Sequence, residues 1–189
     1  MKTTVFQVSE GYCLRPRLHV GAPLVSSAVM DETWRAMGEW TTAAVRRMQK
    51  RCGEDQEELT GFVLAFTSNL RPEALGLALY VHLVVAQAFR RSGVKFRKIT
   101  PEGIEREWEE NFAFINELKT AGYGCSHFFL PTHLSSEPAV VQYVIDALTV
   151  EDDADPVVLG EAEFWRILQV LKTFADCMHA AAAANIKAA

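Results

Sequence analysis

Hydrophobic and polar positions repeat with a helical period along most of the chain. From Val29 to Cys52, apolar side chains recur every three or four residues, and charged side chains fill the opposite face. The inward stripe consists of Met30, Trp34, Met37, Thr41, Ala44, Val45, Met48 and Cys52. This spacing predicts one amphipathic helix that ends at Gly53.

Five further segments carry helix signals. A second helix is expected over residues 55–68, and a third begins at Pro72, which suits the first turn of a helix. Because residues 75–89 are apolar on every side, we expect this third helix to be the central one. The remaining helices are expected at 100–122, at 135–148 and from about residue 160 onward.

The apolar positions of the later helices predict which side chains are buried. In the fourth helix, the residues expected to face inward are Ile104, Trp108, Phe112 and Ile115. In the last helix, the expected buried stripe is Phe164, Ile167, Leu168, Leu171, Ala175 and Met178. Trp165 and Val170 fall outside that stripe, which predicts a second contact surface, such as one to another subunit.

These elements predict an all-α fold, a single-domain bundle of about six helices. Residues 1–28 are expected to form an irregular N-terminal arm or one weak hairpin, because Pro16 and Pro23 interrupt an alternating pattern. The helical domain is expected over 29–185, followed by a frayed tail at 186–189. A chain of 189 residues is long enough to bury one sizeable core.

Composition indicates a cytoplasmic protein that does not enter a membrane. The most apolar run, residues 74–89, is shorter than the ~20 residues of a membrane span and contains His82 and Gln87. The first residues lack the apolar stretch of a signal peptide. The four cysteines are far apart without a Cys-x-x-Cys pair, which favours reduced thiols over a disulfide framework.

The segment 123–134, YGCSHFFLPTHL, contains the residues best suited to hold a metal. Cys125, His127 and His133 have spacings seen among zinc ligands, and His179 could supply a fourth ligand. Cys177 is the other distant candidate, but Cys177 and His179 point ~200° apart on a helix and cannot chelate one ion together. Without a Cys-x-x-Cys knuckle, an apolar loop that packs on the core is the favoured interpretation, and a zinc site or Cys–His catalysis is the alternative.

Two groups of basic residues could bind phosphate if they are adjacent in space. The first group is Arg46, Arg47, Lys50 and Arg51, and the second is Arg90, Arg91, Lys95, Arg97 and Lys98. The net charge of −5 and the pI near 5.6 favour a solvated face and make nucleic acid an improbable partner.

Sequence motifs for common catalytic chemistry are missing. The chain has no phosphate-binding loop, dinucleotide fingerprint, nucleophile elbow or His-Glu-x-x-His motif. Asp176-x-x-His179 approaches the carboxylate–histidine motif of di-iron bundles, but it occurs once where two are needed. His82, alone on an apolar helix, is expected to be a neutral core histidine bonded to a carbonyl or hydroxyl rather than a haem ligand or a base.

The leading hypothesis is therefore a protein-interaction or assembly module, not an enzyme, that pairs with itself as a homo-oligomer or with another protein. It depends partly on charge: residues 1–98 carry 14 basic and 9 acidic side chains, whereas residues 99–189 carry 5 and 15. The alternative is a small metal- or ligand-binding protein or enzyme with its site at Cys125, His127 and His133. Phosphate or nucleic-acid binding by the basic groups is the third hypothesis.

Overall fold

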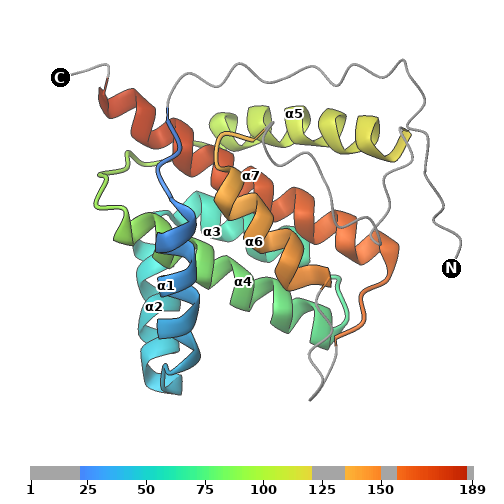
Figure 1. Ribbon diagram of the computed structural model, residues 1–189. Helices are drawn as coiled ribbons and strands as arrows, with labels where there is room; N and C mark the ends of the chain where they lie inside the picture. Colours follow the sequence, from blue (N-terminus) through green and yellow to red (C-terminus); the bar gives the residue numbers. More distant parts are fainter. Residues whose placement is uncertain (1–21, 121–134, 150–156, 187–189) are drawn as a thin grey trace, which may run out of the picture.

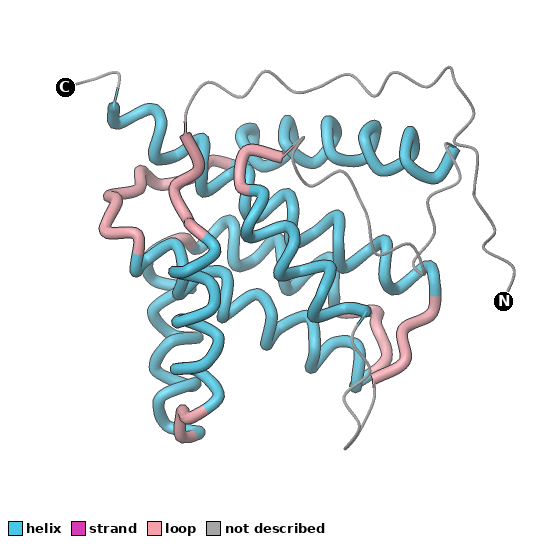
Figure 2. The backbone as a smooth tube through the Cα atoms, viewed as in Figure 1, coloured by secondary structure: helices cyan, strands magenta, loops and turns pink. Residues whose placement is uncertain are grey.

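The computed structural model of the chain describes residues 22–120, 135–149 and 157–186, and these form seven α-helices and no strand (Figure 1). The helices are α1 (Ser27–Gly38), α2 (Thr42–Asp55), α3 (Glu57–Thr67), α4 (Pro72–Arg91), α5 (Pro101–Thr120), α6 (Pro138–Thr149) and α7 (Glu161–Ile186). Figure 2 shows that short loops join α1 through α5. The predicted all-α fold is confirmed.

The predicted first helix is two helices, which accounts for the extra element. α1 ends at Gly38, and Thr41 begins α2 by accepting a hydrogen bond on its side-chain oxygen from the Ala44 N–H at 3.3 Å. The apolar period continues across this turn, so periodicity alone hides the break. Trp34, expected to face inward, is half exposed on α1.

α7 is the central helix, and it packs against α3, α4, α5 and α6. Between Phe164 and His179 every residue except Arg166 is buried. The prediction that Trp165 and Val170 form a second contact surface is therefore wrong, because both are buried inside the chain. The predicted stripe of α7 is confirmed, but the helix has neighbours on all of its sides.

α4, the helix expected at the centre, is the second most buried element. It packs against α1, α2, α6 and α7, although Tyr80 is partly exposed on it. Within the described residues α4 alone is long and apolar enough to cross a membrane by length and composition. Ten of its residues are buried against other helices, as in the core helix of a globular domain.

The ends of the chain bear on the predicted domain limits. α1 begins at Ser27, within the segment expected to be the N-terminal arm, and α7 reaches Ile186. Residues 1–21 and 187–189 lie outside the described residues, so the arm and the tail remain predictions.

Candidate functional site

The predicted metal site cannot be placed in the fold, except for one of its residues. Cys125, His127 and His133 lie outside the described residues, and zinc binding stays a prediction. Among the described residues no group of three or more His, Cys, Asp and Glu side chains could hold a metal ion. His179 is buried, with Nδ1 2.7 Å from Oε1 of Glu137.

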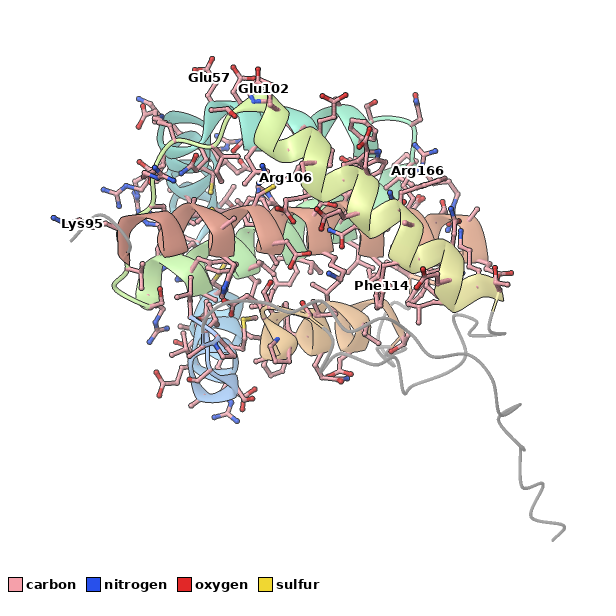
Figure 3. The ribbon with its side chains drawn as sticks, turned by 90° about the horizontal axis from the view of Figure 1, so that it is seen from above. Glu57, Lys95, Glu102, Arg106, Phe114 and Arg166 are labelled. Atoms are coloured by element: carbon pink, nitrogen blue, oxygen red, sulfur yellow. The ribbon has the colours of Figure 1, made fainter. Side chains whose placement is uncertain are left out.

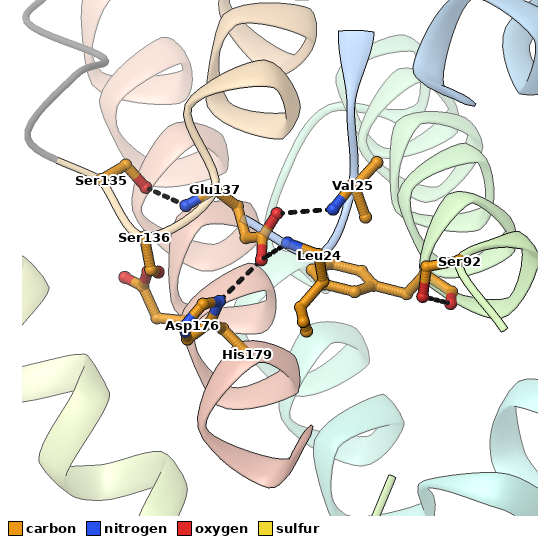
Figure 4. Close-up of polar contacts among 9 residues, drawn as sticks. Leu24, Val25, Ser92, Ser135, Ser136, Glu137, Asp176 and His179 are labelled. Atoms are coloured by element: carbon orange, nitrogen blue, oxygen red, sulfur yellow. Dashed lines mark hydrogen bonds and ion pairs between the residues drawn. The ribbon is translucent and has the colours of Figure 1, made fainter. Parts of the chain in front are cut away.

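Glu137 joins three segments that are distant in the sequence (Figure 4). It is fully buried just before Pro138, the first residue of α6. Its two carboxylate oxygens accept the backbone N–H groups of Leu24 at 2.8 Å and Val25 at 3.1 Å. With His179 on α7, these contacts tie the segment before α1 to α6 and α7. Sequence reasoning missed Glu137, because nothing in its local pattern distinguishes it from a solvated carboxylate at a helix start.

Asp176 is the centre of a second buried polar cluster between α5, α6 and α7. Its carboxylate accepts hydrogen bonds from Lys172 Nζ at 2.7 Å, Asn111 Nδ2 at 3.0 Å and Ser136 Oγ at 2.5 Å. Lys172 and Asp176 are both almost fully buried, so their charges neutralise each other away from water. The carboxylate of Asp176 thus contacts Lys172, Asn111 and Ser136, whereas Nδ1 of His179 contacts Glu137.

His82 lies in the core, as predicted, but without the expected hydrogen bond at Nε2. That atom has no partner among the described residues, and the ring packs edge-on against Phe174 with centroids 4.7 Å apart. Burial lowers the pKa of His82 to about 4, so the side chain is neutral at pH 7.

The second basic group is divided among several contacts. Arg91 pairs with Glu32 of α1 at 3.3 Å, and Lys98 Nζ donates to the Glu54 carbonyl at 2.6 Å. Arg90 instead faces α2, with Nη1 3.6 Å from Met48 Sδ. Lys95 projects away from the helices at the edge of the molecule (Figure 3). Arg90 thus meets the first basic group rather than the rest of its own.

Phe112 is more exposed than the sequence predicts, and it therefore contributes to the surface of the protein. It was expected to face inward, yet its side chain is 53% exposed, so that prediction is wrong. Phe112 lies ~40° around α5 from Trp108, on the side away from buried Asn111. α7 and α3 are the two helices that pack against α5, and they leave about half of the Phe112 side chain exposed.

Three aromatic side chains pack together where α3 meets α5: Phe62, Phe66 and Trp108. These three and the exposed Phe112 of α5 are hereafter the α3–α5 aromatic surface. The Trp108 ring lies 4.6 Å from that of Phe66 and 5.5 Å from that of Phe62, and the two Phe rings are 4.8 Å apart. Phe112 follows Trp108 by one helical turn. Phe66 is 37% exposed, while Phe62 and Trp108 are half-buried beneath the exposed pair.

Carboxylates flank these aromatic side chains. Glu58, Glu105 and Glu109 each stand one helical turn before an aromatic residue of the surface, and each is exposed. None of the three has an ion pair among the described residues. Glu57 and Glu102, in the first turns of α3 and α5, both appear at the upper edge of the molecule in Figure 3. Arg106, the cation nearest on α5, is paired with Glu107 at 3.2 Å. The surface is therefore aromatic at its centre and acidic at its margin.

Comparisons with known proteins add no relative to this picture. No family model, no curated protein and no solved structure matches the chain. The function therefore has to be argued from the chemistry of these surfaces.

Proposed function

We propose that this chain is a protein-interaction module whose α3–α5 aromatic surface binds a basic, amphipathic segment of a partner protein. The observation that carries the proposal is the exposure of Phe66 and Phe112 beside carboxylates without cationic partners among the described residues. Buried thiols at Cys52 and Cys177 fit a reducing, cytoplasmic setting for such a module.

The apolar part of the surface supplies binding energy. Burying the exposed parts of Phe66 and Phe112 would contribute on the order of 4 kcal/mol before the cost of association. Aromatic side chains are enriched at the centres of protein interfaces because their large, rigid surfaces lose little conformational entropy. The half-buried Phe62 and Trp108 give the partner a fixed platform, since they already contact each other and Phe66.

The charge of the margin selects the partner. Lys or Arg side chains flanking an apolar stripe would meet Glu58, Glu105 and Glu109, which speeds association and suppresses acidic competitors. A second copy that offered the same surface would instead place like charges opposite one another. Homo-oligomers remain a prediction, and charge favours their forming through a different pair of surfaces.

A pair of model peptides tests this proposal by fluorescence anisotropy. One is an amphipathic helix of Leu and Lys, and the other carries Glu in place of every Lys. The wild-type chain should bind the Lys peptide, with little binding of the Glu peptide. Phe112→Ser should weaken binding by about tenfold, because it removes an exposed anchor. The control is Leu64→Ser, since Leu64 is equally exposed but lies on the opposite side of α3.

Neutralising the margin gives a second, independent comparison. Replacing Glu105 and Glu109 together with Gln should slow association and reduce its dependence on salt. Asp31→Asn on α1 with Glu39→Gln directly after it changes the net charge equally and should leave binding unchanged. Equal weakening by both pairs, or by Phe112→Ser and Leu64→Ser, would mean that the peptide binds without using this surface. Light scattering distinguishes a basic partner from a second copy of the chain. If the wild type forms an oligomer that dissociates in Phe112→Ser, a second copy and not a basic partner occupies the surface.

A further inference from the structure

A groove at the other side of the molecule, between α2 and α4, gathers positive charge. It has a volume of about 400 Å³ beside the turn that joins α1 to α2, and Trp40, Arg47, Arg51, Gln87 and Arg90 line it. Arg47 and Arg51 are one turn apart on α2, and Arg90 reaches the groove from α4. The packing of α2 on α4 thus unites one residue of the second basic group with two of the first.

The three guanidinium groups have no acidic partner at the groove among the described residues. No acidic side chain lines the groove, and none of the three has an ion pair among the described residues. The acidic Asp55 lines a neighbouring cavity instead, and Arg90 lines both that cavity and the groove. Like charges four residues apart on one helix repel each other, and a third cation nearby adds to that cost. An anion bound in the groove would relieve the repulsion between them.

The side chains that line the groove indicate which kind of anion would bind there. Guanidinium groups donate planar pairs of hydrogen bonds that match phosphate oxygens. The half-buried, aromatic Trp40 lines the same groove, and Gln87 adds an amide donor and acceptor. The volume is within the range of sites for small ligands. The net charge of −5 counts against a long nucleic-acid strand, which needs an extended basic surface.

We propose that this groove binds a small phosphorylated ligand with a planar ring, of the nucleotide class, with its phosphates on Arg47, Arg51 and Arg90 and its ring on Trp40. The site is separate from the α3–α5 aromatic surface, and either proposal can fail without the other.

Calorimetric titration of the full chain with ADP, adenosine and inorganic phosphate tests the assignment. ADP should bind once per chain, at least about tenfold more tightly than either fragment. Arg47→Ala with Arg51→Ala should weaken ADP binding by more than about tenfold, and high salt should weaken it in the wild type. Trp40→Leu should weaken ADP binding but leave that of inorganic phosphate unchanged.

Arg46→Ala is the control at a single position, because Arg46 is on the same helix, carries the same charge as each groove arginine and does not line the groove. The three arginines of α2 are exposed, so circular dichroism should match the wild type in each of the arginine variants. Absence of saturable ADP binding up to about 10 mM would overturn the site, as would an Arg46→Ala effect equal to that of the double variant. Adenosine binding as tightly as ADP would overturn the role of the arginines, and phosphate binding as tightly as ADP would overturn that of Trp40. Tighter binding of an oligothymidylate would make single-stranded nucleic acid the ligand instead.

Discussion

His82 is an ionisable side chain enclosed by the core, with its ring against Phe174 and Nε2 without a partner among the described residues. The folded chain protonates it only near pH 4, whereas the unfolded chain does so near pH 6.5. Between these values the unfolded state binds more protons. The contribution of His82 to the free energy of unfolding is therefore complete above pH 6.5 and is lost as the pH falls toward 4. The loss amounts to up to about 3 kcal/mol.

Replacing His82 with Leu should remove this pH dependence, because Leu is apolar and does not titrate. Urea unfolding at pH 7 and pH 5 measures the effect. The wild type should lose more free energy of unfolding than His82→Leu between the two values. Comparing the two chains cancels the contribution of the carboxylates to the pH dependence, because both chains contain the same carboxylates. An identical loss in both would mean that His82 is protonated, or reached by water, in the folded state.

At the scale of elements, Glu137 connects the segment before α1 to α6 and α7. Glu137→Ala would leave the N–H groups of Leu24 and Val25 and the Nδ1 atom of His179 without their acceptor. We expect a loss of about 3 kcal/mol in the free energy of unfolding, because unpaired buried polar groups carry a full desolvation cost. Chemical denaturation measures this loss, and amide exchange at residues 24 and 25 should accelerate.

Two other replacements test whether the loss of stability comes from the buried contacts of Glu137. Glu137→Gln retains one carbonyl acceptor and should cost less than Glu137→Ala. Glu117→Ala removes an exposed carboxylate from α5 and should change stability by less than about 0.5 kcal/mol. A Glu137→Ala variant as stable as Glu117→Ala would show that the three contacts contribute nothing to folding.

Helices that begin at local sequence signals could be predicted from the sequence, whereas the helices that each of them packs against could not. Pro72 and Thr100 mark the starts of α4 and α5, and Thr100 does accept a hydrogen bond from the Gly103 N–H. The stripe of α7 was also readable, but the burial of Trp165 depends on helices distant in the sequence. The same holds for Phe112, since periodicity cannot tell which apolar side chain lacks a covering helix. Arg90 meets Arg47 only because α4 packs on α2.

Across the whole molecule, burial is concentrated on α7. Backbone amides of residues 164–182 should exchange most slowly, because opening this helix disrupts its contacts with four others. α2 has only Met48 and Cys52 buried and should exchange faster by a factor of about 100, roughly 2.7 kcal/mol in opening free energy. Hydrogen exchange followed by mass spectrometry compares the two helices. Equal protection of α2 and α7 would mean that the chain opens only as a single unit.

The buried polar clusters also constrain how this sequence can diverge. Changing Lys172 or Asp176 alone strands a charge in the core, and changing Asp176 to an apolar residue also removes the acceptor of Ser136 and one of the two acceptors of Asn111. Such positions can change only together, while the exposed residues around them are free to drift. Relatives of this chain should therefore keep two short patterns, Ser-Ser-Glu-Pro at the start of α6 and Lys-Thr-x-x-Asp-x-x-His on α7, after the rest of their similarity has been lost.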